Sequence, residues 1–297
     1  MNVRQHELAT EIAVWCEAQG LSGVVPSIIS DGGNLLLHLA PHAIVARAAV
    51  VLSAEDAASA EAMQRREIRV ARHLHRQGVP AIAPADRVDP GPHLIGGVWV
   101  TFWPYIARTR PEPLQPARAA ELVAQLTAAM GRFKGPLPAL GAWHSVTEAA
   151  ARLRANPDAR GRPLLARYDR TDRLLRALDP AALIPSHGDA HPGNLIASPE
   201  GWTWIDFEDV SRMPAYWDMA SYAANPALLG EGAEEPIYVH MLRHAADPAA
   251  FRRTIGARVL MSILSNLDFA LRGHGDLAFA GRQLDRAEPF FAVLEAD

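Results

Sequence analysis

Hydrophobic and polar residues follow two different periodicities along this chain. Residues 24–52 hold three short apolar runs of strand-like composition, and residues 96–106 form a further run that predicts a buried strand. Between them, residues 54–77 place apolar side chains at helical spacing among many charged ones. From about Pro116 onward the helical period dominates, interrupted by a β segment near 195–206. The pattern predicts an α+β protein with a small β-rich N-terminal lobe and a larger, mainly helical C-terminal lobe.

The chain is expected to pass from one lobe to the other near Pro104, because a proline cannot donate a hydrogen bond to a sheet ladder. We expect an N-terminal lobe over 1–102, a hinge over 103–107 and a C-terminal lobe over 108–297. A cleft between two lobes is a common place for a ligand to bind.

Composition narrows the possible partners and locations. The 297 residues include 29 Lys and Arg against 33 Asp and Glu, a formal net charge of −4, so no basic field favours nucleic acid. Cys16 is the one cysteine, which excludes an internal disulfide and suits a reducing compartment. No stretch approaches the ~20 uncharged apolar residues of a membrane span. We therefore expect a cytoplasmic monomer or homodimer that binds neither nucleic acid nor membrane.

The segment 186–222 carries the polar residues that suggest chemistry. Asp189 and Asn194 lie five residues apart in a turn-rich stretch, where Pro192 and Gly193 prevent a helix. A predicted hairpin then brings Asp206 to the end of an apolar strand. Carboxylate and amide oxygens form a hard donor set, which suits Mg²⁺ carried by phosphates better than zinc.

The same spacing matches the pattern of phosphoryl-transfer enzymes. Kinase catalytic loops place an Asp and an Asn five residues apart, with a metal-binding Asp shortly after. In that pattern Asp189 orients or deprotonates the acceptor hydroxyl, and Asn194 and Asp206 hold the metal. A zinc-hydrolase reading of the HxDxH stretch stays open, although it requires a further ligand and leaves Asn194 and Asp206 unexplained.

The sequence resembles a known family at this point. HGDAHPGN (187–194), IDFED (205–209) and WDMA (217–220) are similar to motifs of the aminoglycoside phosphotransferase and choline kinase group. The resemblance implies a protein-kinase-like two-lobe fold and transfer of the γ-phosphoryl of ATP or GTP to the hydroxyl of a small molecule. It also implies that scaffold residues brace the catalytic loop; these are His187, His191 and Asp218.

A kinase also requires a cation that holds the nucleotide phosphates and a helix carboxylate that positions it. Arg47 and Glu67 are the expected pair, since Glu67 lies on the apolar face of the helix predicted over 54–77. Lysine is usual at this position in the family, but the one lysine of this chain is Lys134. Two alternatives stay open: Arg47 is a surface arginine, or Glu67 pairs with Arg66.

Weaker expectations concern the rest of the nucleotide site. Gly33 and Asn34, in the turn DGGN, are candidates for a loop over the phosphates, although turn formation alone would explain them. By analogy with the fold, backbone groups of Phe102, Trp103 and Tyr105 would bind the base.

The acceptor side is the least determined. Glu208, Asp209 and Asp268 are candidate acceptor-binding residues, because acidic groups complement an aminoglycoside or another amine-bearing alcohol. Three further glutamates cluster between 231 and 235, where a solvated surface explains them equally well. The missing lysine and the unusual glycine turn also leave open a second function, a nucleotide-binding pseudokinase or scaffold protein without turnover.

Overall fold

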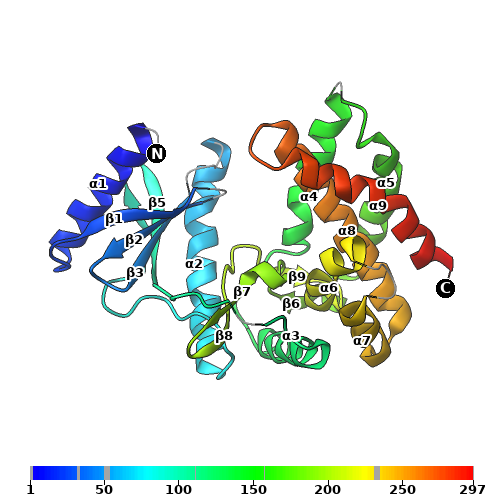
Figure 1. The fold of residues 1–297 in the computed structure, drawn as a ribbon, viewed down its shortest axis with the longest axis horizontal. Coiled ribbons are helices and arrows are strands. Elements are labelled where there is room, and N and C mark those ends of the chain that lie inside the picture. Colours follow the sequence, from blue (N-terminus) through cyan, green and yellow to red (C-terminus); the bar gives the residue numbers. More distant parts are fainter. Residues whose placement is uncertain are drawn as a thin grey trace. The chain divides into compact units, whose positions relative to one another are not determined.

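The structure is a computed structural model in which residues 3–31, 34–49, 54–110, 112–156, 158–230 and 235–296 are described. It divides into two compact units, whose elements are labelled in Figure 1. The N-terminal unit comprises Met1–Pro111 and Ile196–Glu208, and the C-terminal unit comprises Glu112–Leu195 and Asp209–Asp297. The α+β class expected from the sequence is confirmed, with a small antiparallel sheet in the first unit and mainly helices in the second.

A five-stranded antiparallel sheet is the framework of the N-terminal unit, in the order β1-β2-β3-β5-β4. Its strands are β1 (Val25–Ser30), β2 (Leu35–Ala40), β3 (Ile44–Ala48), β4 (His93–Ile95) and β5 (Val98–Pro104). The three apolar runs predicted within 24–52 form β1, β2 and β3. Strand β2 buries Leu35, Leu37 and Leu39 completely, so the alternation seen in the sequence directs one face of the sheet into the core.

Two helices pack against this sheet (Figure 1). Helix α1 (Val3–Ala18) contributes Leu8, Ile12 and Cys16 to the cluster of buried side chains that contains the leucines of β2. Helix α2 (Ala54–Arg76) contacts β5 and confirms the helix predicted over 54–77. It ends before Gly78, whose φ of 72° is the left-handed conformation that commonly closes a helix.

The predicted strand over 96–106 begins two residues too early. Gly96 and Gly97 form the turn between β4 and β5, with φ values of 58° and 74° that suit a two-residue hairpin turn. Strand β4 was not predicted, because three residues are too few to show a period.

The hairpin predicted near 195–206 is present as β7 (Leu195–Ser198) and β8 (Gly201–Trp204). Its residues from Ile196 onward belong to the N-terminal unit. There the Trp204 N–H donates to the Pro80 carbonyl at 2.8 Å, and the Ile82 N–H donates to the Trp204 carbonyl at 2.9 Å. The boundary expected near 103–107 does not anticipate this return of the chain.

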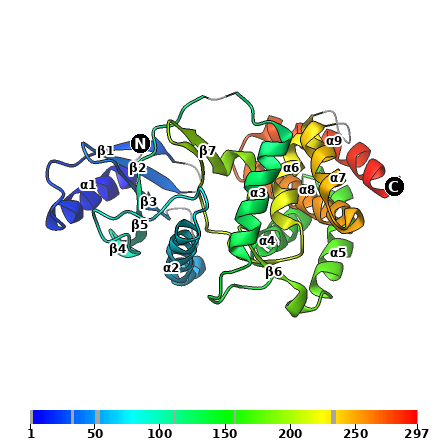
Figure 2. The ribbon, with the colours of Figure 1, turned by 90° about the horizontal axis from the view of Figure 1, so that it is seen from below.

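Helix α8 (Pro248–Leu271) is the centre of the C-terminal unit (Figure 2). It packs against the helices α4, α5, α6, α7 and α9. The helices of this unit are α3 (Pro116–Met130), α4 (Gly141–Ala155), α5 (Arg162–Arg176), α6 (Trp217–Leu229), α7 (Pro236–His244), α8 and α9 (Leu277–Ala296), with short 3₁₀ turns η1 (Pro180–Ala182) and η2 (Pro192–Asn194). By length and composition alone α8 would also suit a membrane span, but 72% of its apolar window is buried inside the protein.

A second small sheet, which the sequence did not predict, precedes and follows the polar loop of this unit. Strand β6 (Ile184–Ser186) pairs with β9 (Ser211–Met213) in antiparallel register. Because β6 ends at Ser186, the segment that begins with His187 leaves the sheet directly.

Candidate functional site

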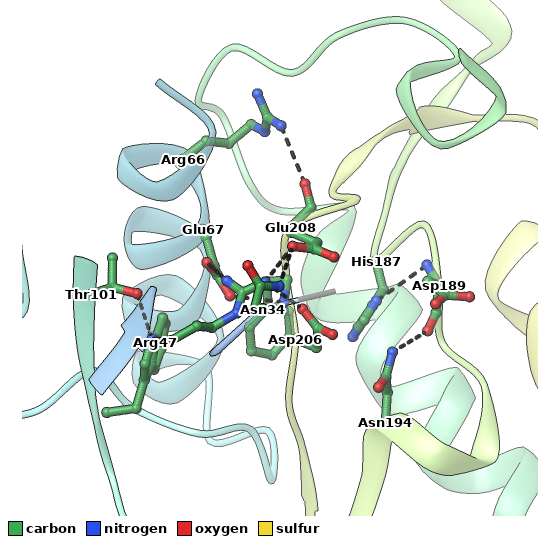
Figure 3. Close-up of polar contacts among 12 residues, drawn as sticks. Asn34, Arg47, Arg66, Glu67, Thr101, His187, Asp189, Asn194, Asp206 and Glu208 are labelled. Atoms are coloured by element: carbon green, nitrogen blue, oxygen red, sulfur yellow. Dashed lines mark hydrogen bonds and ion pairs between the residues drawn. The ribbon is translucent and has the colours of Figure 1, made fainter. Parts of the chain in front are cut away.

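The charged cluster of the N-terminal unit is built around Arg47 (Figure 3). Arg47 lies on β3 and donates through Nη1 to Glu67 Oε2 of α2 at 2.6 Å, so the expected ion pair is present. Its Nη2 also donates to Asp206 Oδ1 at 3.2 Å and to Glu208 Oε2. The alternative partner of Glu67, Arg66, donates instead to the main-chain oxygen of Glu208 at 3.3 Å. Arg47 is therefore a buried cation, with only 7% of its surface exposed.

This cluster carries more negative than positive charge. One guanidinium faces three carboxylates, which leaves a net charge of −2 when all four groups are ionised. Burial raises the pKa of Glu67 to about 7, although Arg47 acts to lower it. Burial opposes the charged form of Arg47, but the charges of Glu67, Glu208 and Asp206 outweigh it and raise its pKa. A further cation would reduce the repulsion among the carboxylates.

Asp206 is held in an uncommon backbone conformation. Its φ is 67°, a left-handed value that few residues other than glycine adopt. The next residue, Phe207, is completely buried and donates its N–H to Glu67 Oε1 at 3.3 Å. The Asp206 side chain is 35% exposed. Strained positions of this kind concentrate at functional sites.

A cavity of about 330 Å³ in the N-terminal unit reaches this cluster. Most of its lining is apolar, and Arg47, Glu67 and Asp206 supply charge. The apolar part includes Val45, Ile82, Trp103, Tyr105, Ile196 and Ile205. Its size and its combination of apolar and charged lining are typical of small-molecule sites.

Some of the main-chain groups expected to bind the base, at 102–105, form hydrogen bonds within the protein. The Phe102 N–H donates to the Pro90 carbonyl at 3.0 Å, and its own carbonyl accepts from the Ala85 N–H at 3.1 Å. The Tyr105 N–H donates to the Ala43 carbonyl at 2.9 Å. The loop 81–90 and the turn before β3 thus use both main-chain groups of Phe102 and the N–H of Tyr105, and binding of a base by residues 102–105 stays a prediction. Trp103 and Tyr105 do line the cavity with their side chains.

The glycine turn is only partly described. Gly33 lies outside the described residues. Asn34 donates from Nδ2 to Glu208 Oε2 at 3.2 Å, so in this structure its side chain contacts the charged cluster.

In the C-terminal unit, α6 holds the main chain of the loop that follows β6. Asp218 accepts the His187 N–H at 3.0 Å and the Gly188 N–H at 3.1 Å, and Trp217 Nε1 donates to the Gly188 carbonyl at 2.7 Å. Asp218 and His187 are buried. Burial raises the pKa of Asp218, while His187 and the two N–H groups act against it.

This loop orients the two polar side chains that the spacing selected. Asn194 donates from Nδ2 to the Asp189 main-chain oxygen at 3.0 Å, so its amide oxygen points away from that contact (Figure 3). His191 accepts the Gly193 N–H at Nδ1, at 2.9 Å, and its Nε2 lies 3.4 Å from Asp189 Oδ2. The Asp189 side chain remains 26% exposed.

Sequence reasoning missed one residue at this loop, Arg258 of α8. Its Nη2 donates to Asp189 Oδ1. Burial by itself would raise the pKa of Asp189, but the charge of Arg258, with further electrostatic contributions from His191 and His187, outweighs it and lowers that pKa. The sequence feature that could have pointed to Arg258 is its position as the one charged residue in the apolar stretch 255–264.

Comparison with models of known protein families shows to which family the chain belongs. The family model of the phosphotransferase enzyme family matches residues 35–254. The chain belongs to this family. A search among curated proteins found no significant match.

Solved structures of several other proteins share the fold of this phosphotransferase. A choline/ethanolamine kinase family protein from Mesorhizobium loti aligns over 99% of this chain and 94% of its own, with a TM-score of 0.61 and 18% identity. An amicoumacin kinase in complex with AMP-PNP, Ca²⁺ and Ami aligns over 97% and 96%, with a TM-score of 0.69 and 14% identity. The aminoglycoside phosphotransferase APH(3'')-Id from Streptomyces rimosus aligns over 87% and 98%, with a TM-score of 0.58 and 18% identity.

The acceptor-binding candidates of this phosphotransferase have other contacts. Glu208 pairs with Arg47 in the N-terminal unit. Asp268 is 4% exposed and accepts from Arg152, whose Nη2 lies 2.9 Å from Oδ2. The Asp209 main-chain oxygen accepts from Ser211 Oγ at 2.9 Å. Of the glutamates at 231–235, Glu231 and Glu234 lie outside the described residues. A role of Glu208, Asp209 and Asp268 in binding the acceptor stays a prediction.

Proposed function

We propose that this phosphotransferase is a Mg²⁺-dependent small-molecule kinase that transfers the γ-phosphoryl group of ATP or GTP to a hydroxyl. The observation that carries the proposal is the loop at Asp189. Asp218 holds its main chain from within the core, yet the Asp189 carboxylate stays partly exposed. A rigid loop that presents a charged oxygen acceptor is suited to orient a hydroxyl for attack.

In the proposed reaction the hydroxyl oxygen of the acceptor forms a bond to the γ-phosphorus. The bond from that phosphorus to the β–γ bridging oxygen breaks, and the nucleoside diphosphate leaves with the electron pair. The hydroxyl proton passes to the Asp189 carboxylate and from there to solvent. Because Asp189 has a lowered pKa, its main contribution is to orient the hydroxyl while charge develops on the acceptor oxygen.

The nucleotide would bind in the cavity of the N-terminal unit. Apolar side chains suit the base, and Arg47 suits the phosphates, since a guanidinium binds phosphate oxygens through paired hydrogen bonds. AMP-PNP in the amicoumacin kinase complex and ADP in the complex of a spectinomycin phosphotransferase agree with a nucleotide co-substrate. Arg47 would take the role that lysine usually has in the family.

The residues present also fit a magnesium ion. Asp206 offers a partly exposed carboxylate in a cluster where three carboxyl groups face one guanidinium, and Asn194 offers an amide oxygen. Among the described residues, no three His, Cys, Asp or Glu side chains are grouped as a metal site made by protein alone would require. Asp206 would therefore bind the ion together with nucleotide phosphates, and Asn194 stays the second ligand that the kinase pattern implies. When bound, Mg²⁺ would neutralise charge on the transferring group.

The acceptor is proposed only as a class. The names of similar structures include choline and ethanolamine kinases, an aminoglycoside phosphotransferase and an amicoumacin kinase. An aminoglycoside or another amine-bearing alcohol is the acceptor class to test first. A second candidate, nucleotide binding without turnover, is favoured by the arginine at position 47.

Phosphate transfer from Mg·ATP and Mg·GTP to a panel of amine-bearing alcohols and antibiotics would test the proposal. The matched control is Asp189→Asn, which keeps the size of the side chain. Turnover in this variant should fall by about 10²–10⁴-fold, because a neutral amide neither orients the hydroxyl through a charged oxygen nor accepts its proton. Equal turnover in both proteins would remove Asp189 from the mechanism. Nucleotide binding without turnover against the whole panel would support the second candidate.

A further inference from the structure

Arg258 lies in the middle of α8, surrounded in sequence by buried apolar residues. It is 6% exposed, and Ile255, Val259 and Leu260 around it are completely buried. Burying a guanidinium costs free energy unless hydrogen-bond acceptors and a counter-charge surround it. The partners of Arg258 therefore indicate why an arginine stands here.

The guanidinium uses each of its three nitrogen atoms for a different partner. Nε donates to Ser221 Oγ at 3.0 Å, Nη1 donates to Ser262 Oγ at 2.5 Å, and Nη2 donates to Asp189 Oδ1. Ser221 and Ser262 are both buried. Because the guanidinium is planar and rigid, two serine contacts determine where its third nitrogen points.

The first of these serines belongs to the helix that already holds the catalytic loop. Ser221 and Asp218 both lie on α6, three residues apart and so on neighbouring positions of one helix face. Asp218 binds the main-chain N–H groups of His187 and Gly188. The main chain of the loop and, through Arg258, its carboxylate are thus both positioned by α6.

We propose that Arg258 is a positioning residue, which fixes the Asp189 carboxylate relative to the loop that presents it. Arg258 binds Oδ1 from inside the unit, and the carboxylate keeps an exposed side that can receive the acceptor hydroxyl. Its positive charge also keeps Asp189 ionised, in keeping with the lowered pKa of that residue. The inference rests on the proposed function, because it assumes that Asp189 acts on the acceptor.

Kinetics of Arg258→Met and Arg258→Lys would test this role, with water as the acceptor so that no acceptor needs to be known. Phosphate release from Mg·ATP should fall about 10²-fold in kcat for Arg258→Met, the typical loss for a misplacement near 1 Å. The KM for ATP should not change, because Arg258 is not part of the nucleotide cavity. Arg258→Lys should recover part of kcat, since it keeps the charge.

The control for the loss of an ion pair in general is Arg154→Met. Arg154 of α4 forms an ion pair with Asp169 of α5 in the same unit. Its replacement by methionine should leave kcat unchanged. A kcat for Arg258→Met within twofold of the wild type, or a change in KM alone, would overturn the inference.

A double-mutant cycle with Asp189→Asn separates the inference from the proposed function. If Arg258 acts through Asp189, Arg258→Met should cause no further loss of kcat in the Asp189→Asn background. Losses that multiply independently would overturn the inference alone. Full turnover in Asp189→Asn would overturn the role of Asp189 in the proposed function and the inference with it. If Arg258→Met does not fold, Ser221→Ala takes its place, with a several-fold loss of kcat expected in the wild type and none in Asp189→Asn.

Discussion

Arg47 and Glu67 form an ion pair of 2.6 Å between Nη1 and Oε2, although their side chains are only 8% and 2% exposed. One residue lies on a strand and the other on a helix, twenty positions later. The two partners differ in what else they contact. Arg47 also binds Asp206 and Glu208, whereas Glu67 receives a second hydrogen bond from the Phe207 N–H.

This difference predicts unequal effects on stability. Arg47→Met leaves three carboxylates without their cation, including the buried Glu67, and should lower the free energy of unfolding by about 3–5 kcal/mol. Glu67→Gln leaves Arg47 paired with Asp206 and Glu208 and should cost less, about 1–3 kcal/mol. Urea denaturation of both variants measures the two values. If Glu67→Gln lost as much unfolding free energy as Arg47→Met, or more, Glu67 would not depend on Arg47 for its charge.

Removing the Asp206 carboxylate should abolish the effect of magnesium on nucleotide binding. In Asp206→Ala we expect ATP affinity in the presence of Mg²⁺ to fall about tenfold or more, equal to about 1.4 kcal/mol per factor of ten. Affinity in the presence of EDTA should change little. Calorimetric titration with and without Mg²⁺ measures both, and Asp89→Ala, on an exposed position of the same unit, is the control. Magnesium dependence that persists in Asp206→Ala would exclude this residue as a metal ligand.

Gly188 should tolerate no side chain. Its φ is 90°, and a Cβ there would lie 2.1 Å from the Asp209 main-chain oxygen. Gly273→Ala is a matched control, because its φ is 81° and nothing lies within 4 Å of the added atom. We expect Gly273→Ala to cost about 1–2 kcal/mol of stability from backbone strain alone. Gly188→Ala should cost more and also lower turnover, because Gly188 holds the loop to Asp218 and Trp217. Thermal melting and turnover assays of the two variants measure these effects. Equal stability and equal turnover of Gly188→Ala and Gly273→Ala would contradict the prediction.

Cys16 should be protected from thiol reagents while the protein is folded. The thiol is completely buried in the core with α1, and burial raises its pKa to about 11. Because only the thiolate reacts, alkylation at pH 8 should require unfolding of the chain. The raised pKa has a consequence for stability. The neutral buried thiol adds to the free energy of unfolding below the pKa of the unfolded thiol, near 8.5. This contribution is lost as the pH rises toward 11.

Labelling by iodoacetamide with and without denaturant, followed by mass spectrometry, measures this protection. Cys16→Ser should lack this part of the alkaline loss of stability. Rapid labelling of the folded protein at pH 8 would contradict the buried placement of Cys16.

The sequence by itself determined the order of β-rich and helical parts, because periodicity is a local property. It also selected Asp189, Asn194 and Asp206, since their spacing on a turn and a hairpin follows from nearby proline and glycine residues. The pairing of Arg47 with Glu67 was within reach, because a carboxylate on an apolar helix face requires a cation. The short strands β4, β6 and β9 could not be predicted from the sequence, because three residues show no period.

Tertiary structure alone decided which charged groups distant in sequence form ion pairs. Glu208 lies 161 positions from Arg47, and Arg258 lies 69 positions from Asp189. Neither separation leaves a mark in local spacing, so the pairing of Glu208 with Arg47 was not predicted and Arg258 was missed. The two main-chain groups of Phe102 and the N–H of Tyr105 likewise form hydrogen bonds to distant segments that no local pattern predicted. Burial and pairing depend on the segments that surround a residue, and only the folded chain brings those segments together.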